Sequence, residues 1–156
     1  SKSRDGMDLS LVAIDRFDNR VQFAGAHNSL YWWNEAEQEL KRIRADKMAI
    51  GGEQMEDERI FTNHEIYVED GDCIYLFSDG FVDQFGGPDD KKFGTKRLKN
   101  LIRKHHEEPM KVQRAKFNLE WRDWIQDDEQ IDDVTLIGIK FSSEDEDKKL
   151  TKKKGD

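Results

Sequence analysis

The sequence is poor in cysteine and proline, and it has no long apolar run. Its single cysteine, Cys73, can form neither an intrachain disulfide nor a cysteine-rich metal site. Because Cys73 lies inside an apolar run, we expect it to be a buried strand thiol. A membrane span needs about 20 consecutive apolar residues, and the first residues hold no apolar targeting segment. We therefore expect a cytoplasmic protein that makes no membrane contact.

Positive charge is also in the minority. The 26 Lys and Arg residues are outnumbered by 34 Asp and Glu residues, and the net charge is -8. This balance argues against nucleic acid or an anionic membrane as the main partner and suits a divalent cation better. Charged residues make up 38% of the chain, yet its apolar residues gather in runs such as residues 74–77. The 156 residues therefore predict one folded domain with a charged surface.

The first half of the chain is predicted to be a β-meander, because short β-favouring runs alternate with turn residues. Three such runs span residues 9–14, 20–24 and 30–33. Two more strands are expected at residues 60–68 and 72–77. They flank Glu69-Asp70-Gly71-Asp72, a segment with the composition of a hairpin turn.

The second half changes character after Asp79. Leu98, Leu101 and Ile102 are spaced for one face of a helix, and a second helix is expected to begin near Pro109. Its apolar stripe predicts core packing and no cofactor site; the stripe consists of Met110, Phe117, Trp121 and Trp124. A last strand is expected at residues 134–141. This order predicts an α+β domain with a largely antiparallel sheet over residues 1–141, and a charged, disordered tail over residues 142–156.

The first candidate site lies where an apolar strand ends in Ser78-Asp79-Gly80. An aspartate at this position projects from the rigid end of a sheet, and the glycine lets a ligand or metal approach the backbone closely. The alternative is an ordinary Asp-Gly turn, which on spacing alone is the commoner structure.

The second candidate site is the acidic pair Asp132-Asp133, just before the last strand. Paired carboxylates at the entrance to a buried strand are costly unless they bind or cap something. The alternative is a surface acidic cluster, because Asp127, Asp128 and Glu129 lie just upstream. Hard oxygen ligands at the ends of separate strands are what Mg²⁺ or Mn²⁺ prefers.

Five segments, in order and at suitable separations, make the sequence resemble the SpoIIE branch of the protein phosphatase 2C-like family. They are Arg4-Asp5-Gly6-Met7-Asp8, Ala24-Gly25-Ala26-His27-Asn28, Met48-Ala49-Ile50-Gly51, Phe77-Ser78-Asp79-Gly80 and Asp132-Asp133-Val134-Thr135-Leu136. The resemblance covers nearly the whole of residues 4–141. It implies an α-β-β-α sandwich with a binuclear Mg²⁺ or Mn²⁺ site at one end of two central sheets.

Carried over by position, the resemblance makes Asp79 a direct ligand of one metal and Asp132 a further ligand. Gly80 and Asp133 would support them, although more distant relatives have an amide in place of Asp133. The implied reaction is in-line attack of a metal-activated water on phosphoserine or phosphothreonine, without a covalent intermediate. No catalytic side chain is assigned.

The remaining motif residues and histidines are expected to have other roles. Asp5 and Asp8 are expected at a pocket rim or turn, and His27 and Asn28 in a turn. No metal or acid–base role is assigned to the other histidines, which are His64, His105 and His106.

The sequence departs from the family at its beginning. A complete SpoIIE-type domain opens with a strand and an Asp-x-Thr-Gly-His-Gly segment whose aspartate bridges both metals, and this chain has no such segment. We therefore expect a C-terminal portion of a phosphatase that is inactive by itself. The alternative is a non-catalytic, phosphatase-like interaction module. By resemblance, the partner is a phosphorylated regulatory protein such as an anti-sigma-factor antagonist, with a sensory or repeat region upstream.

Overall fold

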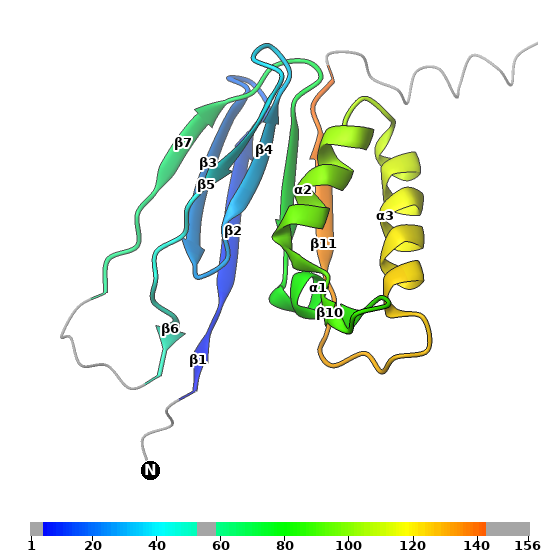
Figure 1. Ribbon diagram of the computed structural model, residues 1–156. Coiled ribbons are helices and arrows are strands. Elements are labelled where there is room, and N and C mark those ends of the chain that lie inside the picture. The colour runs from blue at the N-terminus through cyan, green and yellow to red at the C-terminus, as the bar shows by residue number, and fades with distance from the viewer. Residues whose placement is uncertain (1–4, 53–58, 143–156) are drawn as a thin grey trace, which may run out of the picture.

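The computed structural model describes residues 5–52 and 59–142, and it contains two antiparallel sheets with helices on one side (Figure 1). The predicted tail lies outside the described residues from position 143 onward. Within the described ranges, none of the helices is long and apolar enough to cross a membrane.

The first sheet has three strands in the order β2-β3-β7. These strands are β2 (Leu9–Asp15), β3 (Arg20–Ala26) and β7 (His64–Tyr67). Two short strands pair with each other beyond the lower end of this sheet in Figure 1; they are β1 (Gly6–Met7) and β6 (Ile50–Gly51).

The second sheet has four strands in the order β11-β8-β4-β5. These strands are β4 (Leu30–Asn34), β5 (Glu39–Ile43), β8 (Cys73–Phe77) and β11 (Leu136–Lys140). A small hairpin follows, formed by β9 (Phe85–Gly86) and β10 (Lys91–Lys92). The helices are α1 (Asp79–Asp83), α2 (Gly94–His105) and α3 (Met110–Ile125).

Two apolar clusters hold these layers together. The cluster between the two sheets contains Val21, Phe23, Leu30, Val68 and Ile74. The cluster between the second sheet and the helices includes Tyr31, Trp33, Tyr75, Leu98, Ile102 and Phe117. Helix α2 joins the second cluster because its apolar residues recur at helical spacing. The predicted stripe on α3 also packs there, with Phe117 buried and Met110, Trp121 and Trp124 partly buried.

The predicted α+β class and antiparallel pairing are confirmed, but the predicted meander is wrong. Strand β3 ends at a turn in which His27 has a φ of 61°, and β4 then enters the other sheet. Leu30, Tyr31 and Trp33 are buried while Trp32 is partly buried, so β4 is covered on both faces. Such a strand belongs in the middle of a layered structure.

The predicted hairpin between residues 60–68 and 72–77 is wrong as well. The turn itself forms, with Asp72 N donating to Glu69 O at 3.1 Å and Gly71 at a φ of 91°. However, β7 pairs with β3 while β8 pairs with β4 and β11. The turn therefore carries the chain from one sheet to the other. The short helix α1 is a third helix that the sequence did not predict.

The outer face of the three-stranded sheet is not covered by any helix in the described part of the chain, since α2 and α3 both lie against the other sheet (Figure 1). This outer face carries Leu9, Leu11 and Ala13 of β2, and Leu11 is 60% exposed. An apolar sheet face of this kind normally packs against another layer.

Candidate functional site

Asp79 lies where β8 ends and α1 begins. Hydrogen bonds of Ser78 connect this junction to the residues just before β11. Ser78 N donates to Thr135 O at 3.0 Å, and Thr135 N donates to Ser78 Oγ at 3.0 Å. Ser78 Oγ also donates to Asp133 O at 3.1 Å. The antiparallel pairing of Phe77 with Leu136 continues this connection into the sheet. The two predicted site segments are therefore held side by side.

Gly80 packs directly against the second of these segments. A Cβ added to Gly80 would lie 2.3 Å from Asp133 O and 3.3 Å from Asp132 Cβ. Real Cβ atoms do not approach a backbone oxygen so closely, so only glycine lets α1 pack against the Asp132-Asp133 backbone. This contact brings Asp79, Gly80, Asp132 and Asp133 to one end of the second sheet.

The carboxylates of this cluster face solvent. Asp79, Asp132 and Asp133 are all exposed. Asp132 Oδ1 accepts a hydrogen bond from Asp133 N at 2.7 Å, while the Asp79 carboxylate receives no hydrogen bond from a described residue. Exposed carboxylate oxygens with few protein partners are suitable ligands for Mg²⁺ or Mn²⁺.

Gln84 supports the loop before Asp132, and sequence reasoning missed it. Its side chain is fully buried; Nε2 donates to Glu129 O at 2.9 Å, and Oε1 accepts from Ile131 N at 3.2 Å. Trp124 Nε1 donates to the carbonyl oxygen of Gln84 at 3.3 Å, which ties α3 to the same point. The available signal was an uncharged polar residue in the short segment Phe81-Val82-Asp83-Gln84-Phe85 that follows Gly80.

The other segments that carry the resemblance lie at the same, lower end of the molecule in Figure 1. Gly6 of β1 pairs with Gly51 of β6, so the first and third segments are neighbours. The second segment ends β3, where Asp46 N donates to Gly25 O at 3.0 Å and His27 N donates to Asp46 O at 2.9 Å. His27 thus lies in the expected turn. All five segments therefore gather around one end of the two sheets.

The described residues do not complete a metal site by themselves. Over residues 5–52 and 59–142, no group of three or more His, Cys, Asp or Glu side chains could hold a metal ion. Asp79 and Asp132 match the donor chemistry of Mg²⁺ and Mn²⁺, but a closely spaced metal pair needs a ligand shared between the ions.

Two other histidines have structural contacts away from this cluster. The ring of His106 stacks on Trp33 with centroids 3.8 Å apart, and its Nδ1 lies 3.4 Å from Glu35 Oε2. Trp33 Nε1 donates to Glu35 Oε2 at 2.7 Å, and this hydrogen bond is the main reason why the pKa of Glu35 is lowered. His105 Nδ1 lies 3.2 Å from Glu108 Oε1.

The predicted buried thiol is observed. Cys73 is fully buried, and burial raises the pKa of its thiol. A raised thiol pKa disfavours the reactive thiolate.

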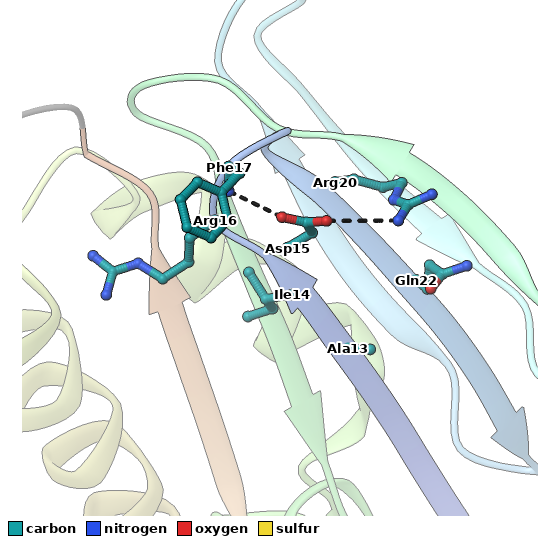
Figure 2. A pocket seen from close by; sticks show the side chains of 7 residues that line it. All are labelled: Ala13, Ile14, Asp15, Arg16, Phe17, Arg20 and Gln22. Carbon is teal, nitrogen blue, oxygen red and sulfur yellow. Dashed lines mark hydrogen bonds and ion pairs between the residues drawn. The ribbon is translucent and has the colours of Figure 1, made fainter.

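A hollow in the surface lies at the opposite end of the first sheet, beside the turn between β2 and β3 (Figure 2). Asp15 Oδ1 accepts from Phe17 N at 3.0 Å there, and Asp15 Oδ2 lies 3.6 Å from Arg20. These contacts shape the turn. The hollow contains none of the predicted site residues, so it does not bear on the carboxylate cluster.

A family profile and several solved structures match the chain. The sequence profile of the family "Stage II sporulation protein E (SpoIIE)" matches residues 2–142. No curated protein sequence matches the chain. Among solved structures, the SiaA-PP2C domain of Pseudomonas aeruginosa is 31% identical with a TM-score of 0.76, and the match covers 86% of this chain and 52% of that one.

Two further structures share the fold at low sequence identity. The phosphatase domain of SpoIIE from Bacillus subtilis, soaked with Mn, is 14% identical with a TM-score of 0.63, over 88% of this chain and 57% of that one. The serine/threonine phosphatase PstP/Ppp of Mycobacterium tuberculosis is 14% identical with a TM-score of 0.54, over 88% and 60%. The chain thus spans between half and two thirds of these relatives.

Proposed function

Since the chain belongs to the SpoIIE family and has its PP2C-like fold, we propose that it forms part of a Mg²⁺- or Mn²⁺-dependent protein serine/threonine phosphatase. Its share of the active site would be the acidic cluster at the ends of β8 and β11. In this proposal Asp79 and Asp132 are metal ligands, and Gly80 and Asp133 support them.

The packing of Gly80 against the Asp132-Asp133 backbone is the observation that carries the proposal. The two segments are more than 50 positions apart in the sequence, yet a Cβ on Gly80 would lie 2.3 Å from Asp133 O. Asp79 directly precedes Gly80, so the side chain of Asp79 extends from the same stretch of backbone that packs against Asp133. A binding site needs such rigid support for its ligands.

The residues of the cluster have different roles in the proposed chemistry. Asp79 and Asp132 would each offer carboxylate oxygen to a divalent cation from a different strand end. Ser78 holds the two strand ends in register through its hydroxyl group. A bound Mg²⁺ or Mn²⁺ would lower the pKa of a coordinated water and offset negative charge on the phosphoryl oxygens.

The names of the solved relatives support the metal and the substrate class. The Bacillus subtilis domain was soaked with Mn, and the Mycobacterium tuberculosis protein is a serine/threonine phosphatase. For this chain we propose a phosphorylated regulatory protein as the substrate, of the anti-sigma-factor antagonist type, in the cytoplasm.

The chain alone is expected to hydrolyse little substrate. Its described carboxylates do not form a group of three that could hold a metal, and it spans only 52% of the SiaA-PP2C domain. The exposed apolar face of β2, with Leu9 and Leu11, is a surface on which a further layer could pack. We propose that the missing ligand comes with that layer.

An activity assay tests the proposal. The chain would be joined to an upstream segment containing Asp-x-Thr-Gly-His-Gly, and Mn²⁺-dependent release of phosphate from a phosphoserine peptide would be measured. Asp79→Ala and Asp132→Ala are expected to abolish turnover, whereas Asp127→Ala, an exposed acid of the same loop, should leave it within about twofold. Strong hydrolysis by the 156-residue chain alone would contradict the need for a further ligand.

Because the set of metal ligands is incomplete among the described residues, a second candidate function is a phosphatase-like module that binds a regulatory protein without hydrolysis. The same assay separates the two functions. If the joined protein is folded and binds Mn²⁺ but releases no phosphate, the binding module is the better assignment.

A further inference from the structure

Charge is strongly segregated along this chain. Residues 91–104 contain seven of its 26 basic residues and none of its 34 acidic residues. Helix α2 holds five of these basic residues. A chain with a net charge of -8 therefore carries one compact region of opposite sign.

Helix α2 presents this charge on a rigid support. Leu98, Leu101 and Ile102 are buried against the second sheet, so the opposite side of the helix faces solvent. We call Lys96, Arg103 and Lys104 the basic face; all three are exposed.

The basic face is not neutralised by the described part of the chain. Arg97 and Lys99 lie over the rings of Trp124 and Tyr31, at 3.9 and 5.4 Å from the ring centroids. In contrast, Lys96, Arg103 and Lys104 form no ion pair with a described residue. Exposed cations left unpaired in an acidic protein create a local positive potential.

The basic region begins beside the carboxylate cluster. Lys92 of β10 forms an ion pair with Asp83 of α1 at 3.2 Å, and α1 starts at Asp79. Helix α2 follows β10 directly and extends away from this end of the molecule (Figure 1). A protein bound along α2 would therefore have one end at the carboxylate cluster.

We propose that the basic face of α2 docks an acidic surface of the phosphoprotein partner. This inference rests on the proposed function for one point, which is that the partner is the phosphoprotein substrate. The acidic remainder of this chain repels an acidic partner, and the basic face attracts it, so the partner is held in one orientation. That orientation places the partner next to Asp79 and Asp132.

The charge pattern favours a protein over a nucleic acid or a membrane. Asp89 and Asp90 precede the basic region, and Glu107 and Glu108 follow it. The 12 residues of α2 span about 18 Å. A long polyanion or a flat anionic bilayer would extend past α2 and meet these acidic residues, whereas an acidic patch of similar length on a protein would not.

A binding experiment without metal tests the proposal independently of hydrolysis. The probe is a fluorescein-labelled octapeptide of alternating Glu and Ser, titrated with the full chain in about 50 mM NaCl, where surface charges are weakly screened. The triple variant K96E/R103E/K104E should bind the peptide at least about tenfold more weakly. A matched control, K111E/R114E/K116E, makes the same charge change at exposed positions of α3 and should weaken binding by less than about threefold.

Several results would overturn the proposal. The first is an equal loss of peptide binding in the two triple variants, and the second is no measurable peptide binding by the unmodified chain. The third is that a single-stranded oligonucleotide or phosphatidylserine vesicles bind the basic face as tightly as the peptide does. Circular dichroism checks that each variant folds. If the Glu variant does not, K96Q/R103Q/K104Q replaces it, and a loss of about threefold or more is expected.

Discussion

Gly80 is the residue on which the geometry of the candidate site depends most. It lies in the first turn of α1, where alanine would ordinarily be the better helix former. The backbone of Asp133 occupies the place of a Cβ, however. The contact between the two acidic segments thus outweighs local helix propensity at this position.

Gly80→Ala is predicted to lower the free energy of unfolding by about 1–3 kcal/mol. The added methyl group would meet Asp133 O, which belongs to the backbone and cannot rotate away. Urea denaturation measures the change. Gly138→Ala is the matched control, because its nearest neighbour is Met110 Sδ, at the flexible part of a side chain, and its cost should stay below about 1 kcal/mol. Equal losses of unfolding free energy in the two variants would contradict the prediction that the Asp133 backbone makes a Cβ at Gly80 especially destabilising.

Glu35 should contribute to stability in a pH-dependent way. Its pKa is lowered, mainly by the hydrogen bond from Trp33. A carboxylate with a folded-state pKa below its unfolded value stabilises the fold above the unfolded pKa, and this contribution is lost as pH falls through the folded pKa. The difference in unfolding free energy between the unmodified chain and Glu35→Gln should therefore be larger at about pH 7 than at about pH 3. A difference that does not change with pH would contradict this prediction.

Sequence reasoning proposed individual candidate ligands but did not predict the residues that surround and support them. Asp79 and Asp132 were predicted as candidate ligands because carboxylates follow or precede apolar strands and lie in family-like segments. Gln84 was missed, because its hydrogen bonds go to a loop 45 or more positions away. Pairing across such distances has no signal in local residue spacing.

Among the elements, the strands were predicted better than their partners. Residues 20–24 and 30–33 do form strands, as β3 and β4, yet these strands belong to different sheets. The local pattern of apolar residues fixes which residues are extended. Which strands pair is decided by burial of both faces of β4 and β8, a property of the assembled layers.

The loop between α3 and β11 depends on Gln84 for its position, and Gln84→Ala should loosen it. The variant would leave Ile131 N and Glu129 O without their side-chain partner, at a cost of about 1–3 kcal/mol in unfolding free energy. Hydrogen exchange should be faster at Ile131 and in the neighbouring loop. Gln22→Ala on β3 is the control, with an expected change within about 0.5 kcal/mol. Unchanged exchange at Ile131 would contradict the proposed support.

For the molecule as a whole, the two sheets differ in what covers them. Helices α2 and α3 cover the outer face of the four-stranded sheet, and the other outer face remains open among the described residues (Figure 1). Composition alone could not have predicted this open face. In the proposed function, a further layer on this face would bring the ligand that completes a metal site with Asp79 and Asp132.

The central claim is that Asp79 and Asp132 serve one metal-dependent active site. A double-mutant cycle tests it most directly, with Mn²⁺-dependent kcat/KM for a phosphoserine peptide measured in the chain joined to the Asp-x-Thr-Gly-His-Gly segment. If both acids act in one site, Asp79→Asn and Asp132→Asn should each lower kcat/KM at least about 100-fold, and the double variant should be little worse than either. Losses that multiply in the double variant, or activity that survives either substitution, would contradict the claim.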